Sequence, residues 1–348
     1  GTLSVADSAS LLADTADQYT IEVTVTDGGT PALDDTATVT LRRETVPAGL
    51  LGHWRLDDAS GGTAEDWTWR NDGTYQGDVA AIAGPVGGDA ATFDGGGDYV
   101  ALNNPDHLEI TGEITLSAWI KPEATDGLHN IIVRGHHNDP KGEIYLRINS
   151  GQYQIGSWNG ANYYASAAIP SGDVGRWTHV AGVYDRTHWR LYRNGVEVAS
   201  QEESTGAVPV ETGWAIGSRA TGTERFFQGG IDDARIYGRG LSSAEVLQLA
   251  TTYDNMAPSL PDATMAALAS SAEGQAVGQM AAEDPLTRES FGYAITGGDP
   301  SGIFAAAADG TISVADPVVL KLDPAEVWQL EVTATDDGPS PLSATATA

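Results

Sequence analysis

Short stretches in which apolar and polar residues alternate are the dominant pattern along this chain. Alternation with a period of two puts successive side chains on opposite faces of a strand. The clearest stretches are TLSAWIKP (115–122), GEIYLRI (142–148), WTHVAGVYD (177–185), WRLYRNGVEVA (189–199) and GGIDDARIYGR (229–239). Asn194-Gly195 predicts a tight hairpin between two strands, and the capping-box spacing of Ser242 and Glu245 predicts one short helix. The pattern predicts an all-β chain of many short strands.

The two ends of the chain repeat one pattern. Residues 1–41 and 310–348 share, in the same order, a GT-[LI]-SVAD strand, a leucine-rich turn, an alternating strand, the motif T-D-x-G and a Ser/Thr/Ala strand. The segment between them differs, because it holds eight of the nine Trp and 14 of the 18 basic residues. Composition therefore places boundaries near Pro47 and near Asp254–Pro258. We expect three domains, covering residues 1–45, 48–250 and 255–348.

Residues 1–45 contain only the second half of the repeated pattern. Alone, these strands would leave open sheet edges, which folded proteins avoid. We expect the remaining strands to come from a longer parent chain; the alternative is that a neighbouring chain supplies them.

The chain is strongly acidic, with a formal net charge of −30 from 48 acidic and 18 basic side chains. Such a field repels nucleic acids and anionic membrane surfaces. It suits either binding of divalent cations or a simple solubilising surface, and charge alone does not separate the two. Cysteine is absent, which for an extracellular chain favours a bacterial source. No apolar run approaches the roughly 18 residues of a membrane span.

Six motifs of the middle segment stand in the order found in one known family. They are LLGHWRLDD (50–58), ATFDGGGDYVAL (91–102), EITLSAWIKP (113–122), RWTHVAGVYD (176–185), WRLYRNGVEVA (189–199) and FQGGIDDARIYGRGLSSAEV (227–246). Nearly all of 50–250 thus resembles the laminin-G-like, concanavalin-A-like jelly-roll family. The resemblance implies two stacked antiparallel sheets. It also implies binding of glycans, proteins or lipids without catalysis.

The flanks resemble bacterial cadherin-type repeats, in motifs such as Ala282-Glu283-Asp284 and Thr335-Asp336-Asp337-Gly338. The resemblance implies immunoglobulin-like β-sandwich modules, the N-terminal one partial, which act as calcium-stiffened spacers. A degenerate linker at Asp254–Pro258 departs from the family pattern, so we expect fewer ions than at an animal cadherin junction. The calcium ligands that the resemblance implies are Asp27, Asp254, Glu273, Asp284, Asp323, Glu326 and Asp336.

A further calcium site is expected in the middle domain. In the sequence Asp94-Gly95-Gly96-Gly97-Asp98, two carboxylates flank a glycine turn, and Ca²⁺ prefers such oxygen ligands. The family pairs its first and last strands, which would bring Asp232 near this turn. The alternative is that Asp94 and Asp98 cap the turn through their own hydrogen bonds.

A polar and aromatic strand face is the expected ligand surface. Residues 142–148 put Glu143, Tyr145 and Arg147 on the face opposite their aliphatic residues. Aromatic rings stack on sugar C–H faces while Arg and carboxylates bind hydroxyls, so a glycan is the leading ligand. The alternative is a structural ladder of these side chains. The candidate ligand-binding residues are Arg134, His136, Glu143, Tyr145, Arg147, Gln154, Trp158 and Tyr163.

Catalysis is not expected. The motifs G-x-S-x-G, P-loop and H-E-x-x-H do not occur, and paired carboxylates such as Asp57-Asp58 are adjacent rather than opposed across a cleft. We expect a segment of a large secreted or surface-displayed, calcium-dependent adhesin whose middle domain binds an extracellular polysaccharide or glycoconjugate. Two alternatives stay open: a protein–protein adhesion module, including self-association, and an accessory binding region of a secreted polysaccharide-degrading enzyme.

Overall fold

The chain folds into antiparallel β-sheets, which confirms the expected all-β class. Two compact units are present, Gly1–Ala48 and Gly49–Ala348. The computed structural model describes residues 18–26, 28–29, 34–42, 47–59, 62–102, 104–136, 142–253, 256–286, 290–322, 327–338 and 341–348.

The first unit is described as a single β-hairpin. Strand β1 (Gln18–Thr26) pairs with β2 (Asp34–Arg42), in a register that runs from Gln18 opposite Arg42 to Thr26 opposite Asp34. The hydroxyl groups of Thr24 and Thr36 lie 2.9 Å apart across the pair. Apart from residues 28–29, the rest of the expected half-repeat, including Asp27, lies outside the described residues.

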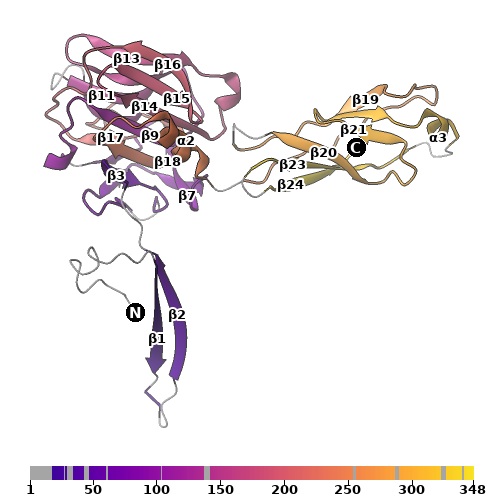
Figure 1. The fold of residues 1–348 in the computed structure, drawn as a ribbon, viewed down its shortest axis with the longest axis horizontal. Helices are drawn as coiled ribbons and strands as arrows, with labels where there is room; N and C mark the ends of the chain where they lie inside the picture. The colour runs from indigo at the N-terminus through magenta and orange to yellow at the C-terminus, as the bar shows by residue number, and fades with distance from the viewer. Residues whose placement is uncertain are drawn as a thin grey trace. The chain divides into compact units, whose positions relative to one another are not determined.

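Residues 50–237 form a sandwich of two eight-stranded sheets, as expected for a jelly roll (Figure 1). Sheet I has the order β13-β12-β11-β10-β17-β8-β5-β4, and sheet II has the order β16-β15-β14-β9-β18-β7-β6 with β3 paired to β18. The strands of sheet I are β4 (Thr63–Ala64), β5 (Gly73–Gln76), β8 (Tyr99–Ala101), β10 (Leu128–His136), β11 (Gly142–Asn149), β12 (Gln152–Trp158), β13 (Asn162–Ala168) and β17 (Trp214–Ile216). The strands of sheet II are β3 (Leu50–Trp54), β6 (Ala80–Ala83), β7 (Asp89–Asp94), β9 (Ile114–Pro122), β14 (Thr178–Tyr184), β15 (His188–Arg193), β16 (Val196–Glu202) and β18 (Gln228–Tyr237).

The main hydrophobic core lies between these sheets. On β11, the fully buried Ile144, Leu146 and Ile148 belong to it, which confirms the alternation read from the sequence. Gly182 of β14 lets the two sheets approach closely, because a Cβ there would lie 2.1 Å from Ile155 of β12. The side chains between these inward positions therefore point to the outer face of sheet I.

Helix α2 (Ser243–Thr251) packs beside the sandwich and starts where the sequence predicts. The Ser242 hydroxyl accepts from the Glu245 amide at 3.3 Å, and the Glu245 carboxylate accepts from the Ser242 amide at 2.8 Å. Both halves of the capping box are thus present. Two 3-10 turns, η1 (Asp106–Leu108) and η2 (Ser171–Asp173), complete this part of the chain.

Residues 276–347 form two three-stranded sheets with a core of their own, built around Ile312, Leu330 and Val332. One sheet has the order β19-β22-β21 and the other β20-β23-β24. The elements are β19 (Ala276–Gln279), β20 (Phe291–Gly297), β21 (Phe304–Ala306), β22 (Thr311–Val314), α3 (Pro317–Leu322), β23 (Glu331–Asp336) and β24 (Ser343–Thr347). Within the described residues, no helix is long and apolar enough to cross a membrane.

Candidate ligand-binding sites

The outer face of sheet I brings together the polar residues that the sequence singled out. Arg147 donates from Nε to Oε1 of Gln154 at 3.1 Å, and from a terminal nitrogen to Glu143 at 3.5 Å. Its guanidinium carbon lies 3.6 Å from the centroid of the Tyr145 ring. Four predicted residues from β11 and β12 therefore form one connected cluster.

This cluster is covered rather than open, which corrects the expectation of an accessible ligand surface. Arg225, from the loop before β18, donates to Oε1 of Glu143 at 2.6 Å. The exposed fractions of Tyr145, Glu143 and Arg147 are only 0%, 2% and 8%. Burial raises the pKa of Tyr145 to about 12. Because the charges are paired within the protein, the structural-ladder alternative describes this face better.

The other predicted ligand residues are dispersed. Arg134 is 1% exposed, and its guanidinium donates to the carbonyl oxygens of Thr212 and Leu108, so it holds loops together. Tyr163 packs against the main core, whereas Trp158 stays partly exposed at the end of β12. The side chain of His136 lies outside the described part of the chain.

An open polar groove runs along the edge strands of the two sheets. β13 ends sheet I and β16 ends sheet II, and the two strands lie side by side (Figure 1). The groove between them has a volume of 350 Å³. Tyr164 is its one aromatic residue and is 40% exposed. The groove is lined by Asn162, Tyr164, Ala165, Ser166, Ala199, Ser200, Gln201 and Glu203.

Strand register explains why Tyr164, and not Tyr163, faces outward. Trp158 pairs with Asn162, and Gly156 pairs with Tyr164, so Tyr164 shares the outer face with Trp158. Gly156 leaves room for this ring, because a Cβ there would lie 2.5 Å from the Cβ of Tyr164. Tyr163 was the predicted ligand residue, and two adjacent tyrosines do not by themselves show which of them faces outward. The short turn between Trp158 and Asn162 is the sequence feature that determines which tyrosine faces outward.

The expected calcium site of the middle domain is not assembled. The Asp98 carboxylate accepts from the amides of Asp78 at 2.7 Å and Asp94 at 3.0 Å, and Asp94 accepts from the Gly96 amide at 2.6 Å. These bonds match the turn-capping alternative. Asp94 pairs with Gln228, so Asp232 lies four residues further along β18, about 13 Å away at the usual rise per strand residue. The three carboxylates therefore do not form one site.

Asp232 instead lies on the outer face of sheet II. It is fully buried, and its Oδ2 accepts from the Val86 amide at 3.1 Å. Its Oδ1 has no hydrogen-bond partner among the described residues. Burial and the neighbouring Asp233 raise the pKa of Asp232 to about 9. Asp233 itself is paired, since His53 lies 2.6 Å from its Oδ1 and Arg235 lies 2.9 Å from its Oδ2.

In the C-terminal repeat, two of the expected calcium ligands, Asp284 and Asp336, are buried. Asp284 is 2% exposed, and its Oδ2 has no hydrogen-bond partner among the described groups. Burial and the Asp336 carboxylate raise the pKa of Asp284. Glu273 lies in an exposed turn, and Asp254, Asp323 and Glu326 lie outside the described residues. The described residues contain no group of three or more His, Cys, Asp or Glu side chains that could hold a metal ion.

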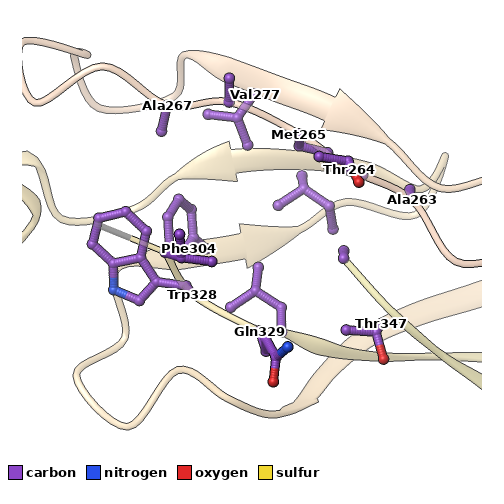
Figure 2. A pocket seen from close by; sticks show the side chains of 14 residues that line it. Ala263, Thr264, Met265, Ala267, Val277, Phe304, Trp328, Gln329 and Thr347 are labelled. Carbon is purple, nitrogen blue, oxygen red and sulfur yellow. The ribbon is translucent and has the colours of Figure 1, made fainter. Parts of the chain in front are cut away.

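A second cavity, of 420 Å³, opens in the same repeat between residues 263–267 and residues 327–330, which precede β23 (Figure 2). Figure 2 shows Phe304 and Trp328 at one end and Thr347 at the other. Its lining contains no titratable side chain, and Phe304, Ile312 and Leu330 belong to the core of this repeat. The cavity is therefore an opening into that core without the convergent polar groups of a binding site.

A comparison with protein families matches part of the middle segment. Residues 94–247 match the family model of the concanavalin A-like lectin/glucanases superfamily. The jelly-roll domain thus has the fold that its motifs predict. The matched residues run from the end of β7 into helix α2. A comparison with curated protein sequences finds no match.

Solved structures of three further proteins are similar to this chain over part of its length. Domain 4 of a GH43 extracellular arabinanase from Geobacillus stearothermophilus, in complex with arabinotriose, is 24% identical; the match covers 58% of this chain and 98% of that domain, with a TM-score of 0.42. The binding domain of Paraclostridial Mosquitocidal Protein 1 is 14% identical over 59% of this chain and 52% of its own, with a TM-score of 0.46. Trypanosoma rangeli sialidase with sialic acid is 20% identical over 60% of this chain and 34% of its own, with a TM-score of 0.45.

Proposed function

We propose that this chain is a segment of an extracellular adhesin whose jelly-roll domain binds a polysaccharide in the groove between β13 and β16. One observation carries the proposal: an exposed tyrosine, Tyr164, stands in an open groove whose other side chains are small or polar. A volume of 350 Å³ falls in the range of about 300–1,000 Å³ that is usual for small-ligand sites. The name of the matched superfamily, lectins and glucanases, supports a carbohydrate as the ligand.

The groove has the chemistry that a sugar requires. The Tyr164 ring offers an apolar face for the C–H side of a pyranose or furanose, and its hydroxyl stays polar. The amides of Asn162 and Gln201 can both donate and accept, and the Glu203 carboxylate can accept from sugar hydroxyls. Both bordering strands end their sheets, so their outer backbone groups also border this groove.

Binding without catalysis is the activity that this arrangement supports. Glu203 is the one carboxylate among the groove residues, whereas glycoside hydrolysis generally uses two carboxyl groups on opposite sides of the scissile bond. We therefore assign the groove to recognition, and the flanking repeats to spacing.

Titration of the full chain with oligosaccharides chosen from a glycan array tests the groove. Tyr164→Ala should weaken binding about tenfold, since stacking contributes roughly 1.4 kcal/mol. Val196→Ala is the matched control, because Val196 is exposed on β16 but does not line the groove. Equal affinities of wild type and Tyr164→Ala would place the sugar elsewhere, and silence on every glycan would refute the carbohydrate assignment.

Calcium belongs to this proposal as a stiffener of the C-terminal repeat. Asp284 and Asp336 are both buried, and the Asp336 carboxylate raises the pKa of Asp284, a repulsion that a cation would offset. Oδ2 of Asp284 suits a hard cation, because no described protein group donates to it. Other ligands would come from backbone carbonyls and water, as is common for Ca²⁺.

A further inference from the structure

Trp69 is the most exposed of the large apolar side chains in the described residues, with 85% of its surface accessible. It lies in the loop between β4 and β5 of the jelly roll. Its φ angle is +62°, in the left-handed region that costs an L-residue roughly 1–2 kcal/mol. A bulky residue held in this conformation and in water points to a function outside the fold's own stability.

The loop that carries Trp69 is organised around one buried carboxylate. Asp66 is 1% exposed, and its Oδ1 accepts from the amides of His53 and Thr68, each at 2.9 Å. Its Oδ2 accepts from the Thr68 hydroxyl at 2.6 Å and from the Asn71 amide at 3.0 Å. The Trp69 amide donates to the Asp66 carbonyl oxygen at 2.7 Å. Trp69 is therefore presented in one backbone conformation before any ligand arrives, which lowers the entropy cost of binding.

A second indole of the same loop is also fixed. The guanidinium carbon of Arg55 lies 3.3 Å from the centroid of the Trp67 ring, and the His53 ring lies 6.3 Å from it. Trp67 is 37% exposed. Among the described residues, no aromatic ring or cation packs on Trp69 in this way, and it keeps most of its surface in water. The loop thus packs Trp67 against Arg55 and His53, and leaves Trp69 in solvent.

The residues around Trp69 indicate which class of ligand it suits. Its exposed neighbours Glu65, Arg70 and Asp72 are charged, so the continuous apolar patch of a protein hot spot is missing from this part of the described chain. The net charge of −30 opposes docking on an anionic membrane. A sugar ring has one apolar face and a rim of hydroxyls, which matches a single indole bordered by charged hydrogen-bonding groups.

We propose that Trp69 is the stacking residue of a second carbohydrate site, which takes one ring of a neutral polysaccharide. This inference rests on the proposed function and extends it to a domain with two sites. The loop follows β4, at the opposite end of sheet I from β13. Six to seven inter-strand spacings of about 4.8 Å separate the Trp69 loop from β13, which puts the two proposed sugar sites on the order of 30 Å apart. Such a domain binds two points of one long glycan, or bridges two glycans.

Calorimetric titration of the full chain with neutral tetrasaccharides tests the second site, since these are too short to reach both. The probes are cello-, xylo-, arabino- and maltotetraose, with tetragalacturonate as the acidic comparison. Wild type should bind two molecules of the preferred tetrasaccharide, and Trp69→Ala and Tyr164→Ala should bind one each. Affinity for the matching polysaccharide should fall at least tenfold in Trp69→Ala, because avidity is lost. Trp69→Tyr should still bind two molecules, since it keeps an aromatic ring at that position.

The outcomes separate the two assignments. The second site would be overturned, and the groove kept, by one pair of results. Trp69→Ala would show unchanged stoichiometry and polysaccharide affinity, and Tyr164→Ala would show no binding. Binding abolished in Trp69→Ala alone would keep the Trp69 site and refute the groove. The absence of any tetrasaccharide binding would overturn both. Trp69-dependent association with phosphatidylcholine vesicles, or a Trp69-dependent dimer without sugar, would overturn the sugar assignment in favour of those partners.

Discussion

At the residue scale, the Glu143 carboxylate holds two guanidinium groups in place under the loop before β18. Arg147 and Arg225 both donate to it, and all three side chains are at least nine-tenths buried. Ion pairs taken out of water repay their desolvation only when every charge is matched. Glu143 is thus a structural centre of the outer face of sheet I, although its residue type suggested ligand binding.

Removing that carboxylate should strongly destabilise the jelly roll. Glu143→Gln removes the carboxylate that both buried guanidinium groups share and leaves Arg225 with the half-exposed Glu224 at 3.7 Å. Breaking a buried pair costs about 3–5 kcal/mol. Urea denaturation followed by tryptophan fluorescence measures the free energy of unfolding. Glu197→Gln is the control, since its pair with Arg190 is partly exposed and contributes about 0–1 kcal/mol. Equal losses for the two variants would contradict the structural role of Glu143.

At the scale of elements, helix α2 illustrates how local sequence and a tertiary contact combine. Glu245 closes the capping box and also accepts from Arg239, at 2.6 Å, just after β18. The hydrogen bond from Arg239, with that from the Ser242 amide, lowers the pKa of Glu245 from 4.5 to about 2. The start of the helix is therefore fixed to the last strand of the sandwich.

This contact makes a defined contribution to stability against acid. Because the pKa of Glu245 is lowered on folding, its stabilisation is complete above about pH 4.5 and is lost as the pH falls through about 2. Wild type should exceed Glu245→Gln by about 0.5–1 kcal/mol at pH 7, since the pair is partly exposed. The difference in unfolding free energy should shrink between pH 4.5 and 2. A difference that is constant over this range would refute the assignment.

Local patterns predicted the strands better than they predicted the site. The alternation in 142–148 was sufficient to place Ile144 and Leu146 in the core, because strand phase is a property of neighbouring residues. The cover on that face was not predictable in this way, since Arg225 and Glu143 are 82 residues apart in sequence. The groove likewise depends on long-range pairing, because Tyr164 and Glu203 line one groove only where the edges of two different sheets come together. Sites made by long-range pairing are therefore hidden from periodicity.

At the scale of the whole molecule, acidity and modular structure belong together in the proposed adhesin. The chain carries a net charge of −30, contains no cysteine, and combines a jelly roll with further β modules. Without disulfides, bound calcium is one means of stiffening a β repeat. The repeat that contains Asp284 is therefore expected to depend on the cation.

Calcium should raise the thermal stability of the full chain, and chelation should reverse the effect. An ion that binds only the folded state adds about 2.7 kcal/mol at a hundredfold excess over its Kd. Differential scanning calorimetry with calcium and with chelator measures the shift. Asp284→Asn should remove most of it, whereas Asp309→Asn, which changes an exposed turn carboxylate of the same repeat, should retain it. A wild-type melting temperature that is indifferent to calcium would contradict the calcium proposal.

The central claim is that the jelly roll holds a sugar in the groove between β13 and β16. A crystal structure of the full chain soaked with the preferred tetrasaccharide tests this most directly, because it locates the ligand as well as detecting it. The account predicts a sugar ring stacked on Tyr164, with hydroxyls in reach of Asn162, Gln201 or Glu203. A groove free of sugar at saturating concentration, in a crystal that leaves it open to solvent, would contradict it.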